Sequence, residues 1–419
     1  MILARWLSKA QLGVWALFLT VITIFEATKS SLLKNAHIKF VSSSKDEKER
    51  SVIASSSFII NALITILFIL LLISFGDWLS ELLNSGNDLS LLLKLFVPGL
   101  IGMIFFSHLE AIQQSHLDFK GVSAGYIVRQ ISFFVLILFE VLYHSSFSLI
   151  NLAIYQSISI ILGAIVLYFS SRKYVAHIFT PTKLWMKKIV GYGGYIFGSG
   201  VASNIYANVD QLMIASFISS TSVSYYNVAT RINNLIDIPS YAAAEILFPK
   251  SAQAAAEEEN SRIKYLYERM VGILLSFIIP ILLFILVFPK LVIELVAGSQ
   301  YTLAAPILQL YILTGLIRPM QNQAANLLNS IGKPALCFYL NTFGLLLNLV
   351  LNYIFLHSIG FPGAAVGTFC SICIVSFLWY FVIKKQISIS LPNIFKYTSD
   401  VYKNMYSYTV GFLRKRKVN

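Results

Sequence analysis

Charged residues are scarce in this sequence. Only 12% of its 419 residues are Asp, Glu, Lys or Arg, whereas 57% are hydrophobic. An ordinary soluble domain carries about 25% charged residues, so this composition excludes one. Apolar runs of about 20 residues recur along the whole chain, which is the length a helix needs to cross about 30 Å of hydrocarbon. The sequence therefore predicts an all-α, polytopic membrane protein.

Cysteine is also rare, with three in the chain. Cys370 and Cys373 form a CxxC inside an apolar run without a second cluster, so we expect packing rather than metal or redox chemistry. The glycine-rich stretch GYGGYIFGSG (191–200) lacks the GK[ST] ending of a phosphate-binding P-loop. Its glycines favour close helix packing, with a hinge as the alternative. No cofactor and no metal site are predicted.

Eleven membrane spans are predicted from the apolar runs. They lie near residues 11–35, 52–76, 91–113, 123–143, 149–170, 192–217, 223–249, 266–288, 303–328, 335–356 and 362–383. The connections between them are short, and the longest, near 171–190, has about 20 residues. This leaves no room for a soluble catalytic or nucleotide-binding domain.

The formal net charge of +13 does not indicate nucleic acid as a partner, because basic residues gather in alternate loops. These loops hold Lys48, Arg50, Lys120, Arg172, Lys173, Lys183, Lys187, Lys188, Lys250, Arg262, Lys264 and Lys333, whereas the loop around Glu81 and Asp88 is acidic. By the positive-inside rule, the basic loops and the C-terminus face the cytoplasm. The polar and basic tail, 386–419, is expected to lie on anionic membrane lipid.

An internal repeat is indicated by two stretches, MILARWLSKAQLGVW at the start and LMIASFISSTSVSYY (212–226). Aligned, they pair Ser8 with Ser219, Leu12 with Val223 and Trp15 with Tyr226. A weaker match sets GLI at 99–101 against GLI at 315–317. Both matches shift the chain by about 215 residues and six helices, as parallel repeats do. The alternative is chance similarity between short apolar stretches.

The repeat predicts two helical bundles, 1–175 with five spans and 190–385 with six. The span 192–217 then has no partner in the first half. We therefore expect the first helix of a twelve-helix architecture to be missing ahead of the first span.

Several charged residues lie inside the predicted spans, where a charge costs at least a few kcal/mol unless it faces a cavity or a partner. They are Glu26, Lys29, Lys34, Arg129, Glu140, Asp210, Arg231, Asp237 and Arg318. Glu26 and Lys29 are one helical turn apart and either pair or line a pore. Asp210, Arg231 and Arg318 favour a cavity. For Lys34, Arg129 and Glu140, extension to the lipid headgroups is an equal alternative.

These residues resemble a known family. The stretch from Asp210 to Pro249 is similar to two helices of the MOP superfamily flippases for polysaccharides and lipid-linked oligosaccharides. The family pattern of Asp, Tyr, A-x-R-[IL], Pro and Leu-x-Pro is met at Asp210, Tyr226, Ala229, Arg231, Pro239 and Pro249. LNSIGKPA around Gly332, GFPGAAVGT around Gly363, and HLEAIQQSHLDFKG resemble further landmarks. The resemblance covers essentially the whole chain and is closest to Wzx-type O-antigen or capsule flippases, except that the family's first helix is absent.

The resemblance implies a MATE-like fold of two bundles that open alternately to each side of a bacterial cytoplasmic membrane. The substrate it implies is an oligosaccharide linked to undecaprenyl pyrophosphate, with a polysaccharide polymerase machinery as a further partner. Lys29 and Arg231 are then expected to contact the pyrophosphate or acidic sugars, followed by Arg129 and Arg318. Glu26 and Asp210 would pair a cavity cation or couple transport to H⁺ or Na⁺, and the membrane potential gives direction.

Two other functions compete with this one. A multidrug exporter of the same fold would need cavity carboxylates that outnumber cations, whereas cations are at least as prominent here. A membrane polysaccharide polymerase would be expected to have one long external loop with catalytic residues, and the predicted external loops are all short. The sequence thus favours a flippase over an enzyme.

Overall fold

The computed structural model describes residues 2–44, 46–116, 118–143, 148–174, 179–256, 260–331 and 333–416. Within these ranges every regular element is a helix. Gly332 of the motif LNSIGKPA lies outside them, and so do the side chains of Pro249 and of residues 192–200. The chain forms two compact units, Ile2–Ser224 and Tyr225–Asn419. The sequence predicts the boundary between the two bundles at residues 175–190. The two compact units of the structure meet at Ser224.

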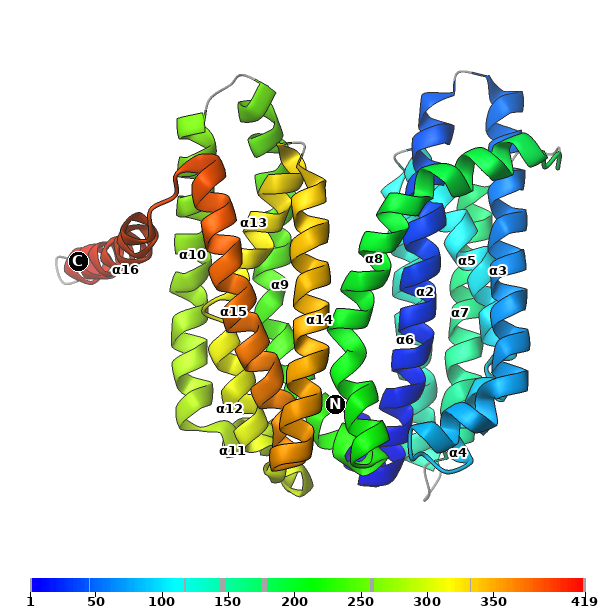
Figure 1. Cartoon of the computed structure of the whole chain (residues 1–419), viewed down its shortest axis with the longest axis horizontal. Helices are drawn as coiled ribbons and strands as arrows, with labels where there is room; N and C mark the ends of the chain where they lie inside the picture. Colours follow the sequence, from blue (N-terminus) through cyan, green and yellow to red (C-terminus); the bar gives the residue numbers. More distant parts are fainter. Residues whose placement is uncertain are drawn as a thin grey trace. The chain divides into compact units, whose positions relative to one another are not determined.

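The first unit begins with α1 (Ile2–Trp6) and α2 (Lys9–Ser43). It continues through α3 (Glu47–Leu82), α4 (Asp88–Leu95), α5 (Val97–Ser115), α6 (Phe119–Tyr143), α7 (Leu149–Ser171) and α8 (Lys183–Phe217). Helix α8 packs along α2, and α7 packs against both α5 and α6 (Figure 1). A Cβ at Gly13 of α2 would lie 1.8 Å from the Ser220 carbonyl oxygen, so only glycine permits this approach.

Helix α3 shows how the sequence distributes its side chains. Its buried face carries small polar residues at intervals of about one turn, including Ser51, Ser55, Asn61 and Thr65. Its outward face is aliphatic, and Leu67 is 58% exposed. A soluble helix shows the opposite distribution. The arrangement is that of a helix that faces lipid outside and meets polar partners inside.

The second unit contains α9 (Ser220–Ala256), which begins at the end of the first unit, and α10 (Asn260–Val287). The unit continues through α11 (Pro289–Val296), the 3₁₀ helix η1 (Ser299–Ala304), α12 (Ala305–Thr314), α13 (Arg318–Ser330), α14 (Pro334–Ile359) and α15 (Pro362–Ile387). Helices α14 and α15 pack closely as a hairpin. A Cβ at Gly363 would lie 2.1 Å from the Phe355 carbonyl oxygen, and one at Gly367 would meet Asn352 at 2.4 Å. Both glycines thus serve helix packing.

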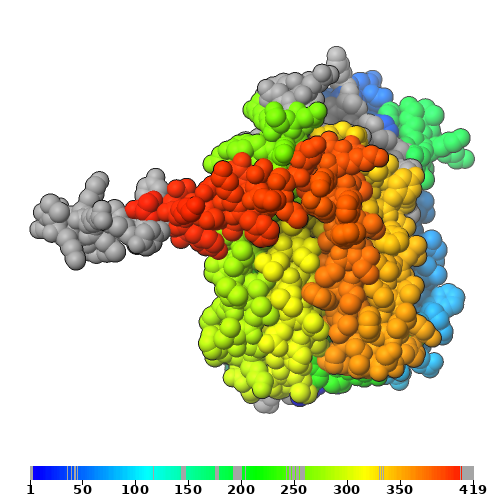
Figure 2. All heavy atoms as spheres, turned by 60° about the vertical axis from the view of Figure 1, so that its left-hand side comes forward, coloured from blue at the N-terminus to red at the C-terminus, as the bar shows by residue number. Residues whose placement is uncertain are grey.

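The C-terminal helix α16 (Leu391–Arg416) extends away from the other helices of its unit (Figures 1 and 2). It is attached to α10, where the Thr398 hydroxyl donates to the Gly272 carbonyl at 3.1 Å and the Tyr402 hydroxyl donates to the Ser276 carbonyl at 2.6 Å. Glu268 accepts from the Ser390 amide at 2.7 Å just before the helix begins. Ile394 is buried in this contact, whereas Phe395 is exposed.

Seven described helices are long and apolar enough to cross a membrane, namely α2, α3, α6, α7, α10, α14 and α15. Two bent pairs bring the number to as many as nine: α4 with α5 (48°), and η1 and α12 with α13 (45°). The chain is thus a multi-pass membrane protein. The two further predicted spans, 192–217 and 223–249, fall on α8 and α9, which are helical but do not meet that criterion over their described residues.

The two halves share local features at the positions that the sequence aligns. The Ser8 hydroxyl accepts from the amide of Gln11 at the start of α2, and the Ser219 hydroxyl accepts from the amide of Ser222 at the start of α9, both at 3.2 Å. Each half also contains one of the bent spans. In both, a proline lies in the first turn after the bend, where its missing N–H does no harm. These features support a repeat rather than chance similarity.

Candidate functional site

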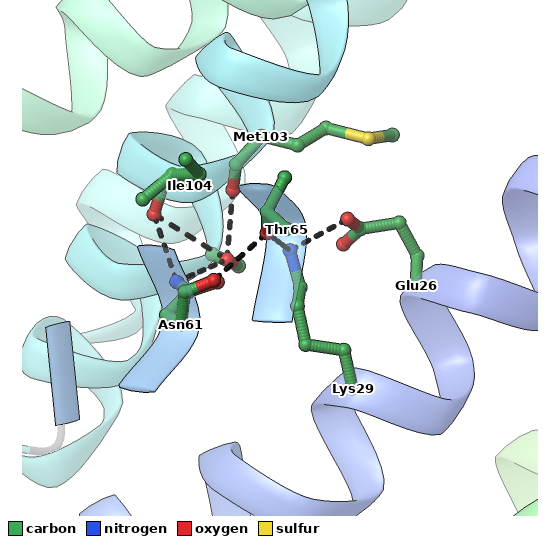
Figure 3. Close-up of polar contacts among 7 residues, drawn as sticks. Glu26, Lys29, Asn61, Thr65, Met103 and Ile104 are labelled. Atoms are coloured by element: carbon green, nitrogen blue, oxygen red, sulfur yellow. Dashed lines mark hydrogen bonds and ion pairs between the residues drawn. The ribbon is translucent and has the colours of Figure 1, made fainter. Parts of the chain in front are cut away.

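The most buried cation of the first unit is Lys29 on α2, whose side chain is 2% exposed. Its Nζ lies 2.7 Å from Oε1 of Glu26, one turn earlier on the same helix, and donates to the Thr65 hydroxyl of α3 at 3.4 Å (Figure 3). The ring of Phe25 lies 5.2 Å below the ammonium group. Glu26 and Lys29 therefore form the ion pair that their spacing allows, and Thr65 of α3 accepts a further hydrogen bond from Lys29.

Hydrogen bonds between α3 and α5 fix the wall behind Lys29. The Asn61 side chain donates to the Ile104 carbonyl at 3.0 Å and to the Ser107 hydroxyl at 3.1 Å. The Thr65 hydroxyl donates to the Asn61 carbonyl at 2.8 Å (Figure 3). Because each bond satisfies a polar group that has no water to bind inside a membrane span, the wall holds Lys29 in one position.

A second ion pair joins α2 to α5. The Nζ of Lys34 lies 2.8 Å from Oε1 of Glu110, and the Gln114 amide donates to the same oxygen at 3.1 Å. Lys34 is 30% exposed and Glu110 is 8% exposed. The sequence left open whether Lys34 has a partner in the protein or extends to the lipid headgroups. The structure shows Glu110 as its partner.

Arg129 on α6 completes the group. Its guanidinium lies 5.2 Å from the ring centroid of Phe106, a cation–π distance. Its Nε is buried and has no hydrogen-bond partner among the described residues. Nor does any carboxylate in the described ranges lie within ion-pair distance of Arg129. Glu140 lies nearer the C-terminal end of the same helix and is buried. It accepts hydrogen bonds from Asn151 and Tyr155 at 2.6 and 2.5 Å, so it has a structural role in the α6–α7 contact.

A cavity of about 290 Å³ lies beside these side chains, between α2, α5, α6 and α7. Its lining includes Glu26, Lys34, Glu110, Tyr126 and Arg129, and we call it the central cavity. With Lys29 behind Glu26, the group holds three cations and two carboxylates, so one positive charge is left over. A cation that is desolvated and unpaired attracts an anion strongly, since the protein interior screens charge far less than water does.

The remaining sequence candidates are not among the residues that line the central cavity. Asp210 on α8 is buried in the first unit. Arg231 on α9 is exposed in the second unit, where its Nε donates to the Asn227 side chain at 2.7 Å.

Arg318, also in the second unit, forms an ion pair with Asp237 at 2.7 Å. The Asn233 amide, oriented with its oxygen toward Arg318, accepts from the guanidinium at 2.6 Å and donates to the Tyr311 carbonyl at 3.2 Å.

Three members of the site were not singled out from the sequence: Asn61, Thr65 and Glu110. Each reaches the group from another helix, so no local spacing connects it to Lys29 or Lys34. For Glu110 a signal exists, because a carboxylate inside an apolar span needs a cation nearby. Asn61 and Thr65 resemble any polar residue of a helix interface.

The fold is shared with solved structures of helical membrane proteins. The structure matches an inward-facing MATE family multidrug transporter of the MOP superfamily with a TM-score of 0.82 and 15% identity, over 91% of both chains. It also matches the lipid II flippase MurJ in its inward closed conformation, with a TM-score of 0.80 and 16% identity, over 98% of this chain and 88% of that one. At such identities the likeness shows the fold alone.

The family follows from the sequence comparison. Residues 2–306 match the family described as "Polysaccharide biosynthesis protein", and the chain belongs to that family. It is similar to the probable low-salt glycan biosynthesis flippase Agl15 of Haloferax volcanii, with 25% identity over 48% of this chain and 43% of Agl15. It is also similar to the teichuronic acid biosynthesis protein TuaB of Bacillus subtilis, with 26% identity over 50% of this chain and 44% of TuaB. The chain thus spans less than half the length of these relatives.

Proposed function

We propose that this protein moves a phosphorylated, lipid-linked oligosaccharide across the membrane for the synthesis of a surface polysaccharide. The observation that carries the proposal is the charge arrangement of the central cavity. Lys29 and Lys34 are each paired with a carboxylate, whereas Arg129 is not. Two relatives, the probable glycan biosynthesis flippase Agl15 and the teichuronic acid biosynthesis protein TuaB, support the same function.

The physical problem of such a substrate is its phosphate charge. Moving an unpaired ion from water into a medium of low dielectric costs on the order of 20 kcal/mol. In the proposed mechanism, Arg129 receives the phosphate and forms the charge-assisted hydrogen bonds that its Nε lacks. Lys29 and Lys34 can add to the attraction by sharing their protons with both carboxylate and phosphate. The polyprenyl chain stays in lipid, where its burial requires nothing of the protein.

An anionic substrate is favoured over a cationic drug. Glu26, Glu110 and Asp237 each have a Lys or Arg nitrogen within 2.8 Å. A cationic substrate would have to displace that nitrogen before reaching a carboxylate. An anion meets Arg129, which has no carboxylate at ion-pair distance among the described residues.

The finer parts of the proposal rest on the resemblance and on the positive-inside rule. They are undecaprenyl pyrophosphate as the carrier, an O-antigen or capsule repeat unit as the cargo, and a polysaccharide polymerase machinery as the next partner. The proposed location is a bacterial cytoplasmic membrane, which the chain crosses with eleven spans, including 192–217 and 223–249. The bundles 1–175 and 190–385 open alternately to each side. The tail, 386–419, lies on membrane lipid at the cytoplasmic face.

Direction and coupling follow from charge. Moving negative charge out of a cell that is negative inside is downhill by about 2.3 kcal/mol per charge per 100 mV. Glu26 borders the central cavity and Asp210 is buried, and both stay candidates for pairing a cavity cation or coupling H⁺ or Na⁺. Arg231 and Arg318 stay predicted substrate contacts from the second unit.

The test is translocation of a lipid-linked oligosaccharide by the full chain in proteoliposomes. Arg129→Gln should reduce the initial rate at least about tenfold, because a lost charge-assisted bond is worth about 1.5–3 kcal/mol. Lys94→Gln is the matched control, since it breaks an exposed ion pair with Asp77 outside the cavity. Equal rates for wild type and Arg129→Gln would contradict the proposal, as would equal losses in both variants.

A further inference from the structure

A second cavity of the first unit has a lining different from that of the central cavity. Its volume is about 790 Å³, and it lies among the ends of α2, α3, α5 and α7 that meet the basic loops. Arg50, Arg172 and Lys173 line its mouth, against one lining carboxylate, Glu47. We call it the basic pocket. The substrate proposal above does not use any of these residues.

The inner wall of the basic pocket contains a polar group without a partner. His37 is completely buried, and neither ring nitrogen has a hydrogen-bond partner among the described residues. The ring of His108, which also lines the pocket, lies edge-on to it at 5.6 Å. A buried polar group is nearly always satisfied by protein, water or ligand. The pocket therefore offers one hydrogen-bonding wall and one positively charged mouth.

An apolar groove of about 360 Å³ lies next to the pocket, between α5 and α7. Its lining runs from Pro98 to Tyr168 and has almost no polar atoms. Phe105, Leu109 and Tyr168 line both the groove and the basic pocket, so the two adjoin each other. The Arg172 guanidinium lies 5.8 Å from the Tyr168 ring centroid, which puts a cation at the junction.

The groove has the length of one lipid leaflet. From Leu109 to Pro98, eleven residues of helix rise about 16 Å, which is about half of a 30 Å hydrocarbon core. Its lining includes Ile101 and Ile165, which are exposed on the outer face of the unit. One end of the site thus suits an anion at the membrane interface, and the other suits a single hydrocarbon chain beside it.

The occupant cannot pass from this site into the central cavity in this conformation. The void between the two is lined by His37 and His108 on one side and by Ser30, Lys34 and Ser107 on the other. Its volume is about 20 Å³, which is room for one water molecule. A phosphate or sugar does not fit through it. This favours a resident lipid over a substrate in transit.

We propose that the basic pocket and the apolar groove together bind one anionic glycerophospholipid of the leaflet that contacts the basic loops. Its phosphate lies between Arg50, Arg172 and Lys173, and one acyl chain lies along α5 and α7. The lipid joins four helices of the first unit and holds them in one packing arrangement. This site requires only that the protein spans a membrane, so it stands apart from the proposed substrate.

The test is native mass spectrometry of the full chain after incubation with equal amounts of phosphatidylglycerol and phosphatidylcholine. Wild type should retain one phosphatidylglycerol in preference to phosphatidylcholine. The triple variant Arg50→Gln, Arg172→Gln, Lys173→Gln should lower that affinity by about tenfold to a hundredfold, since each basic residue near an anionic lipid contributes about a fivefold effect. The matched control, Lys183→Gln, Lys187→Gln, Lys188→Gln, removes the same charge from exposed positions at the start of α8 and should leave retention unchanged.

Two single variants test the basic pocket and the apolar groove separately, so that the result does not depend on whether the triple variant folds. Asp118→Asn frees Lys173 from a carboxylate at 3.0 Å, and it should raise the affinity for phosphatidylglycerol severalfold. Ile165→Trp fills the groove and should weaken retention, whereas Ile158→Trp on the same helix lies outside the groove lining and should not. Retention of both lipids alike, unchanged retention in the triple variant, or displacement by excess soluble glycerol phosphate would overturn the proposal.

Discussion

At the scale of single residues, three pairs of opposite charge lie within the helices. Lys29 with Glu26, Lys34 with Glu110, and Arg318 with Asp237 each meet within 2.8 Å. Removing one partner of such a pair leaves a charge with neither water nor counter-ion. Among the described residues, the buried Nε of Arg129 has no hydrogen-bond partner, so the state of Arg129 depends strongly on a ligand.

The pairing of Lys29 and Glu26 predicts a non-additive response to substitution. Lys29→Met and Glu26→Gln should each destabilise the protein, because each leaves the other group poorly solvated. The loss of unfolding free energy in the double variant should be smaller than the sum of the two single losses by about 0.5–3 kcal/mol. A double-mutant cycle on unfolding in detergent measures this coupling. Additivity within about 0.3 kcal/mol would show that the pair has no energetic role.

Asp118 and Lys173 give a prediction about pH. A hydrogen bond from Lys173 has the largest effect on Asp118. Together with the bond from the Tyr174 hydroxyl, it lowers the pKa of Asp118 below its ordinary value of 3.8. Hydrogen bonds to Tyr174 and Asp118 raise the pKa of Lys173. Because the folded pKa of Asp118 is the lower one, its contribution to stability is present in full above the unfolded pKa and is lost as pH falls through the folded value.

The stability difference between wild type and Asp118→Asn should therefore be constant from about pH 8 to pH 5. It should decline only below about pH 4, where Asp in the unfolded chain takes up a proton. Unfolding transitions of both proteins across this range give the measurement. A difference that already disappears near pH 6 would mean that Asp118 does not bind Lys173.

Some of these residues could be anticipated and others could not. Glu26 and Lys29 are three positions apart on one helix, so their pairing follows from helix geometry. Asp237 and Arg318 were both identified as intramembrane charges, but their contact spans 81 positions of sequence. Asn61 and Glu110 join the site through packing between helices. That packing depends on many weak contacts that no single stretch of sequence encodes.

At the scale of elements, close helix packing depends on glycine. Gly363 of α15 sits against the backbone of α14, so an added methyl group meets a carbonyl that can move only with its helix. Gly363→Ala should destabilise the protein by about 1–3 kcal/mol. Gly191→Ala is the control, because nothing lies within 4 Å of the added atom.

In a helix interior Ala is favoured over Gly by about 0.5–1 kcal/mol, so the control should be neutral or stabilising. Thermal unfolding of the two variants in the same detergent separates the effects. Equal stability of Gly363→Ala and wild type would mean that α14 and α15 are not as close as described.

The bends show how far sequence predicts an element. Pro98 and Pro319 each lie one residue inside the helix that follows a bend, and proline is known to end the preceding helix. The runs 91–113 and 303–328 were nevertheless predicted as single spans, because hydropathy reports length and not direction. The apolar pattern of α8 and α9 was sufficient to predict helices there. It does not establish that either one crosses the membrane.

At the scale of the whole molecule, composition and the recurrence of apolar runs were enough to predict an all-helical membrane protein. The order of motifs predicted a polysaccharide flippase, and residues 2–306 match the family described as "Polysaccharide biosynthesis protein". The repeat stays a prediction from aligned sequence, and the serine hydroxyl bonds at the starts of α2 and α9 are consistent with it. The central cavity was not visible, because it is formed by what four helices leave unfilled.

The account depends most on Arg129 as the receptor for a phosphate. The direct measurement is the affinity of purified protein for a short-chain polyprenyl pyrophosphate and for the same polyprenol without phosphate. Wild type should bind the pyrophosphate at least about tenfold more tightly than Arg129→Gln does, while both should bind the polyprenol alike. The lipid-site variants at Arg50, Arg172 and Lys173 should keep the wild-type affinity. If Arg129→Gln binds the pyrophosphate as tightly as wild type, the central cavity is not the phosphate site and the proposed function loses its support.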